Sequence, residues 1–115
     1  ILYLITPISF SKLHKVKSDE VFHFHLGDPV EMLQIDEAGR VETQILGADY
    51  LKGQKPQAVV YKNIWQGTKL VKGGKFALLG CTVAPGFEFQ DYISGNKDEL
   101  IKQFPNAKGL IEKYI

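Results

Sequence analysis

Short β-rich segments bounded by Gly, Pro, Asn and Asp recur along this chain at intervals of about eight to twelve residues. That spacing is typical of a β-sandwich or barrel rather than of alternating strands and helices. Nine strands are too many for one open sheet in a chain of 115 residues. We therefore predict a mostly antiparallel fold with strands at Ile1–Thr6, Phe10–Val16, Glu20–Leu26, Val30–Ile35, Val41–Leu46, Gln57–Tyr61, Gln66–Val71, Lys75–Val83 and Glu88–Tyr92.

Two glycine-containing segments lie between pairs of these strands. Asp36–Gly39 separates two alternating runs, and Val71–Lys75 separates two others. Glycine supplies the positive φ angle that tight hairpin turns require. Both segments therefore predict β-hairpins.

The hydrophobic period changes near the carboxyl end. Leu100, Ile101 and Phe104 are spaced three and four apart, and acidic residues at 98 and 99 favour a helix amino terminus. Pro105 ends the pattern, which predicts a short helix after the β body. Another turn or two of helix is expected over 106–114.

Length and composition limit the class of protein. The chain is 44% hydrophobic and 23% charged, which predicts one globular domain spanning residues 1–115. Its longest uncharged apolar stretch, Ile1–Ser11, is shorter than the roughly 20 residues of a bilayer span, so no membrane partner is expected. The net charge is +1 and thirteen of the fourteen basic residues are lysine, which disfavours nucleic acid as a partner.

Cysteine usage and the amino terminus bear on the compartment. Cys81 is the single cysteine, so no internal disulfide can form. The first residues contain no basic region followed by a small-residue cleavage site. We therefore expect a cytoplasmic protein. Because Cys81 lies in an apolar run, we also expect its thiol to be buried and unreactive.

The segment from His14 to Glu20 carries residue types suited to a metal or polar-ligand site. On an extended strand His14 shares a face with Phe10, Lys12 and Val16, and Glu20 shares one with Phe22, Phe24 and Leu26. A turn at Lys17–Asp19 would bring the imidazole and the carboxylate together on an aromatic-rich face. The alternative is an ordinary surface or core histidine beside a capped turn.

His23 and His25 form a second candidate pair. Their spacing puts both imidazoles on one side of a strand, as metal sites require. If Glu20 faces inward, however, a period of two sends both histidines to the opposite face with Val21, against a second sheet or an oligomer interface. A β-bulge near Glu20 would reverse that assignment.

Two further polar residues are candidates for a pocket. The phase of the strand puts Gln66 on a face with Thr68 and Leu70, while Trp65 points the other way. Gln66 is either an amide in an apolar pocket or one satisfied by neighbouring backbone. Glu88, in an alternating aromatic segment, is either a pocket acid or an exposed strand residue. No phosphate loop, Ser-His-Asp order, paired-cysteine zinc pattern or nucleotide fingerprint is present.

Several segments in collinear order carry a resemblance to a known family: Ile1–Pro7, Leu13–Lys15, Ser18–Phe24, Gly27–Pro29, Trp65–Gln66 and Gly80–Phe89. The Ser-Asp-Glu and Ala-Pro-Gly-Phe-Glu-Phe signatures within them are the most specific part. Taken together, these segments resemble the DUF985 group of the cupin superfamily, sometimes described as sugar-epimerase-like cupins. The family usually has a further amino-terminal segment with a Pro-Glu-Gly-Gly-like motif. This sequence contains no such motif, so we expect a truncated or divergent member.

The resemblance implies an all-β fold, a double-stranded β-helix or cupin jelly roll, commonly dimeric. In metal-bearing cupins three histidines and a glutamate hold the ion. Here His14 and Glu20 occupy two of those slots, whereas Val16 and Gln66 occupy the other two. An amide is a weak ligand beside imidazole, so no cofactor is certain and we expect at most a weakly bound divalent metal on His14, Glu20 and Gln66.

We predict that the protein binds a small polar ligand in its cup, with its activity undetermined. The candidate ligand-binding residues are His14, Glu20, Phe22, Phe24, Tyr61, Gln66 and Glu88. One alternative is a sugar or sugar-nucleotide epimerase or isomerase with His14 as base and Tyr61 as acid. A second alternative is a metal-dependent cupin enzyme. A homodimer is expected because a lone domain would expose apolar or aromatic strand faces that include Tyr3, Val21, His23 and Trp65.

Overall fold

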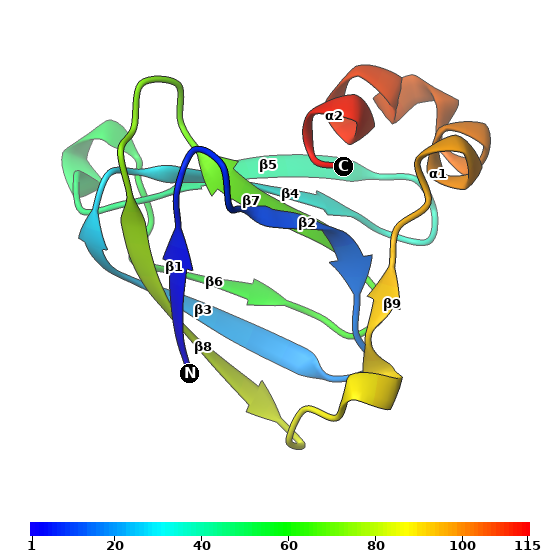
Figure 1. Cartoon of the computed structure of the whole chain (residues 1–115), viewed down its shortest axis with the longest axis horizontal. Coiled ribbons are helices and arrows are strands. Elements are labelled where there is room, and N and C mark those ends of the chain that lie inside the picture. The colour runs from blue at the N-terminus through cyan, green and yellow to red at the C-terminus, as the bar shows by residue number, and fades with distance from the viewer.

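The computed structural model describes all residues, 1–115, and consists of two facing antiparallel sheets with helices outside one of them (Figure 1). The four-stranded sheet has the order β1 (Leu2–Ile5), β8 (Ala77–Ala84), β3 (Asp19–Gly27) and β6 (Gln57–Val60). The five-stranded sheet has the order β5 (Val41–Leu46), β4 (Val30–Ile35), β7 (Trp65–Leu70), β2 (Ser11–Lys15) and β9 (Ile93–Ser94). The predicted all-β fold is confirmed, and no helix is long and apolar enough to cross a membrane.

The main core fills the space between the two sheets, because inward-facing side chains alternate along the strands. The buried apolar side chains of this core are Ile5, Phe22, Val30, Met32, Leu46, Ala58, Val60, Leu70, Ala77, Leu79 and Cys81.

A second core lies between the outer face of the five-stranded sheet and the carboxyl-terminal helices, which cover that sheet in Figure 1. Helix α1 (Lys97–Gln103) begins where the Asn96 side chain accepts a hydrogen bond from the Glu99 amide. A short 3₁₀ turn at Pro105–Ala107 leads into α2 (Lys108–Lys113), so both predicted helical segments are confirmed. The buried members of this core are Leu13, Leu33, Ile35, Leu100, Phe104, Ala107, Ile111 and Tyr114.

The structure corrects two turn predictions. Asp36–Gly39 does join the hydrogen-bonded strands β4 and β5, with Gly39 at φ +85°. Val71–Lys75, in contrast, joins β7 to β8, which belong to different sheets, so it is a crossing turn and not a hairpin. The turn at Lys17–Asp19 likewise leads from one sheet to the other. Turn residues specify a reversal of direction, but they do not specify which strand will be the hydrogen-bonding neighbour.

The predicted strand at Glu88–Tyr92 is wrong. A 3₁₀ turn occupies Phe89–Asp91, and the strand β9 follows it at Ile93–Ser94. This segment crosses from β8 in one sheet to β2 in the other, and it meets a pairing partner only at β9. Alternating aromatic residues therefore indicated a strand where no partner was within reach.

The expectation of a homodimer rested partly on residues that the fold covers. Trp65 packs against the helical core and Tyr3 packs against the main core. Val21 and His23 do lie on the outer face of the four-stranded sheet, where Val21 pairs with Thr82. The homodimer itself stays a prediction.

Candidate functional site

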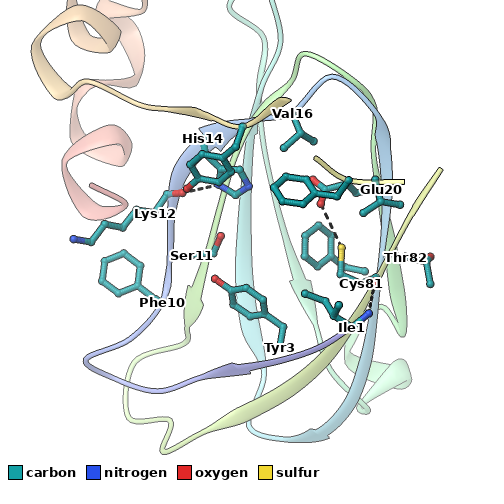
Figure 2. A pocket seen from close by; sticks show the side chains of 14 residues that line it. Ile1, Tyr3, Phe10, Ser11, Lys12, His14, Val16, Glu20, Cys81 and Thr82 are labelled. Carbon is teal, nitrogen blue, oxygen red and sulfur yellow. Dashed lines mark hydrogen bonds between the residues drawn. The ribbon is translucent and has the colours of Figure 1, made fainter. Parts of the chain in front are cut away.

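A cavity of about 690 Å³ opens between the two sheets, within the usual size range of small-molecule sites. Its wall is largely apolar and includes several aromatic rings, and its polar groups come from both sheets (Figure 2). The aromatic members are Tyr3, Phe10, Phe22, Phe87 and Tyr92. The polar members are Ser11, Lys12, His14, Glu20, Cys81 and Thr82.

His14 reaches the cavity from β2 through a β-bulge. Ser11 pairs with Thr68 and His14 pairs with Gln66, so β2 has one more residue than β7 over this stretch. The bulge lets Leu13 pack outward against the helical core while Ser11 and His14 both line the cavity.

The orientation of the His14 ring is set by two contacts. Its Nδ1 lies 2.8 Å from the Lys12 main-chain oxygen, and the ring stacks on Tyr92 with centroids 4.8 Å apart. A carbonyl oxygen can only accept a hydrogen bond, so Nδ1 carries the proton. In the neutral ring the lone pair of Nε2 is therefore free to accept a proton or a hydrogen bond.

Glu20 projects from β3 in the opposite sheet and is only 7% exposed. Its Oε1 accepts a hydrogen bond from Gln66 Nε2 at 2.5 Å, and its Oε2 accepts one from Cys81 Sγ at 3.4 Å. Figure 2 shows the second of these contacts on the cavity wall. Both donors are uncharged, so the carboxylate has no ionic partner in the fold.

Burial and the Glu20 carboxylate raise the pKa values of two neighbouring side chains. Burial first, and then the charge of Glu20, raise the pKa of the Cys81 thiol to about 12. Burial also raises the pKa of Tyr92, with smaller contributions from Tyr3 and Glu20. The predicted burial of Cys81 is confirmed, and both groups are protonated at neutral pH.

The structure brings together three of the predicted site residues. His14 and Gln66 are cross-strand neighbours, and Gln66 is bound to Glu20, although 52 residues separate His14 from Gln66 (66 minus 14). Gln66 lies behind Glu20 and not on the cavity lining. Phe22 also lines the cavity.

Three other candidates lie outside the cavity. Phe24 packs against the main core next to it. Tyr61 is 65% exposed in the turn that follows β6, because it lies beyond the last pairing of that strand. Glu88 is exposed and accepts a hydrogen bond from Gln90 Nε2. In contrast, Tyr3, Phe87 and Tyr92 line the cavity but were not among the sequence candidates.

His23 and His25 lie away from the cavity, as the phase of β3 indicated. The two rings are 6.5 Å apart, and His23 Nε2 is 3.4 Å from Thr82 Oγ1. The register shift in β3 falls between Phe24 and Leu26, too far along the strand to affect Glu20.

The donor set at the cavity does not fit a tight transition-metal site. Gln66 presents its amide nitrogen to Glu20, whereas its Oε1, the atom that could coordinate a metal, has no partner there. Val16, at a slot where the resemblance to metal-bearing cupins implied a histidine, lines the cavity with an apolar side chain. No group of three His, Cys, Asp or Glu side chains comes together in the structure.

A family model described as the cupin superfamily (DUF985) matches residues 1–94. The chain belongs to this family. A solved structure from Shewanella oneidensis is 31% identical with a TM-score of 0.92, covering 98% of this chain and 71% of that one. A hypothetical protein from Leishmania major is 25% identical with a TM-score of 0.93, covering 98% and 73%.

A dTDP sugar isomerase from Desulfovibrio desulfuricans is similar at lower identity. It is 14% identical with a TM-score of 0.75, covering 91% of this chain and 67% of that one, which is evidence for the fold alone. No curated protein matches the sequence. The predicted cupin jelly roll with a short carboxyl-terminal helix is thus confirmed.

Proposed function

We propose that this cupin binds a small polar molecule in the cavity between its sheets. The observation that carries the proposal is the cavity itself, where His14 and Glu20 project from opposite sheets beneath an aromatic wall. A concave apolar site with few convergent polar groups is the usual form of a small-molecule site. Family membership supports the proposal without naming the ligand.

A cavity-filling variant tests this proposal. Val83 lines the cavity, whereas Val59 in the same sheet is 40% exposed on the outer face. We expect small polar compounds to shift the NMR signals of cavity residues, and Val83→Trp to lower their affinity about tenfold or more by occupying the site. Val59→Trp is the matched control and should bind like the wild type. Equal binding by both variants would place the ligand elsewhere.

An isomerase is the second candidate, favoured by an acid and a base on one cavity wall. His14 has a free Nε2, and the protonated Tyr92 phenol stacks against the same ring. Such a pair can remove a proton next to a carbonyl and return one. The likeness to a dTDP sugar isomerase suggests the substrate to try.

Isotope exchange tests the isomerase. In deuterium oxide, a dTDP-linked keto sugar is expected to gain deuterium at the carbon next to its carbonyl, as measured by mass spectrometry. His14→Asn should lower the rate by about 100-fold or more and Tyr92→Phe should lower it less, since general acid–base groups contribute about 10²- to 10⁴-fold. His23→Asn, on the outer face, is the control. Incorporation no faster than in buffer would rule out this candidate.

A further inference from the structure

Glu20 is a carboxylate without an ion-pair partner in the cavity wall. Its two hydrogen-bond donors, Gln66 and Cys81, are both uncharged. The single side-chain ion pair of the chain joins Lys52 to Asp49, in an exposed 3₁₀ turn. A buried carboxylate is costly unless a cation accompanies it. The fold therefore supplies an anion at this site without its partner.

The cationic groups on the lining are few. Lys12 is exposed at the cavity and makes no ion pair with Glu20. The amino group of Ile1 is also on the lining, but it donates to the Cys81 main-chain oxygen at 2.9 Å and makes no ion pair with Glu20. The Glu20 carboxylate therefore stays open to direct pairing with a cationic ligand.

One free acceptor on the lining is the Nε2 atom of His14, since the Nδ1 atom faces the Lys12 main-chain oxygen. The Glu20 carboxylate accepts as well. Behind the lining, Gln66 Oε1 and Thr68 Oγ1 have no hydrogen-bond partner, although each residue is only 1% exposed. The imidazole nitrogen and the carboxylate favour a ligand that donates hydrogen bonds.

The aromatic wall also favours positive charge. Five rings line the cavity, contributed by Tyr3, Phe10, Phe22, Phe87 and Tyr92. The face of an aromatic ring attracts a cation, most strongly where both are out of water. A carboxylate and aromatic rings thus surround one space.

We propose that the ligand of this cavity is an organic cation, an amine or ammonium compound, whose charged nitrogen lies beside Glu20 and against the aromatic rings. The inference rests on the proposed function, because it names the class of molecule that the cavity binds. It differs from the isomerase candidate, whose substrate would carry a diphosphate.

Three probes that share one phenyl ring isolate the effect of charge. They are phenethylamine, 2-phenylethanol and phenylacetate. Each is titrated into the wild-type protein, and binding is followed by the NMR shifts of cavity residues. We expect the amine to bind about tenfold more tightly than the alcohol, within the range of a desolvated cation–π contact, and phenylacetate to bind most weakly. The neutral sugar methyl glucoside is included as a hydroxyl-rich comparison.

Two pairs of variants test whether Glu20 and the aromatic rings cause the preference for the amine. Glu20→Gln removes the charge but keeps an oxygen to accept from Gln66, and it should make the amine bind no better than the alcohol. Glu42→Gln removes an exposed carboxylate on β5 and should change nothing. Phe87→Leu should weaken amine binding, whereas Phe76→Leu should not, because Phe76 is 41% exposed and lies outside the cavity lining.

The outcomes separate this inference from the proposed function. If the alcohol or methyl glucoside binds at cavity residues more tightly than the amine, the proposal of a cationic ligand is overturned. The proposal of a small-molecule site would remain. No binding by any probe would overturn both. An amine preference that survives Glu20→Gln would also overturn the inference, and if that variant does not fold, the ranking of probes in the wild type decides.

Discussion

Replacing Val16 and Gln66 together with histidine is expected to raise the affinity for Zn²⁺ or Ni²⁺ by about a hundredfold or more. Mutating a residue that only hydrogen-bonds to a metal ligand already changes the affinity for the metal by about 10- to 100-fold, so adding two direct ligands should have at least as large an effect. The change would add two imidazoles to that of His14 in the neighbourhood of the Glu20 carboxylate. Val16 lines the cavity, and Gln66 lies directly across from His14. Imidazole is a far better ligand for these metals than an amide.

Single variants and a carboxylate variant complete this test. Gln66→His alone should give a smaller gain than the double variant. Glu20→Gln in the double-variant background should reverse much of the gain, because Glu20 lies next to Gln66. Elemental analysis and calorimetric titration provide the measurement. Tight stoichiometric metal in the wild type would show that His14, Glu20 and Gln66 suffice, and no gain in the double variant would show that the two positions are misaligned.

Local patterns predicted most of the strands but not their neighbours. Alternation identified eight of the nine strands, with ends displaced by a few residues. Pairing depends on contacts between distant residues, which is why the turn at Val71–Lys75 was taken for a hairpin. The strand proposed at Glu88–Tyr92 failed for the same reason, because its alternation has no neighbouring strand to satisfy.

Strand phase predicted the inward side chains of the site on β2 and β3, although it did not predict the bulge in β2. Strand phase placed His14 and Glu20 inward, and both line the cavity. Tyr3 could not be found in the same way, because its neighbours Leu2 and Leu4 are also apolar and prove to be exposed only in the structure. Phe87 and Tyr92 lie on the irregular crossing between β8 and β9, where no period indicates direction.

The second large effect is expected at Tyr114, which ties the helical segment to the five-stranded sheet. Its side chain is fully buried, and its hydroxyl donates to Glu31 Oε1 at 2.5 Å. The ring lies close over Gly67, where a Cβ would come within 3.0 Å of it. Its main-chain oxygen accepts from the Leu13 amide at 2.8 Å, next to His14. The segment thus packs directly behind the strand that carries the site histidine.

Tyr114→Ala is expected to lower the free energy of unfolding by about 3–5 kcal/mol, measured by urea denaturation, because it removes a large side chain from a closed core. Tyr114→Phe should cost only about 1–2 kcal/mol, since the ring stays and the half-buried Glu31 loses one donor. Tyr50→Ala, at a residue 63% exposed, should change the stability by about 0.5 kcal/mol or less. The family match ends at residue 94, so a small effect of Tyr114→Ala would mean that the sheets hold the site without the helices. A large one would make the helical segment part of the folding unit that positions His14.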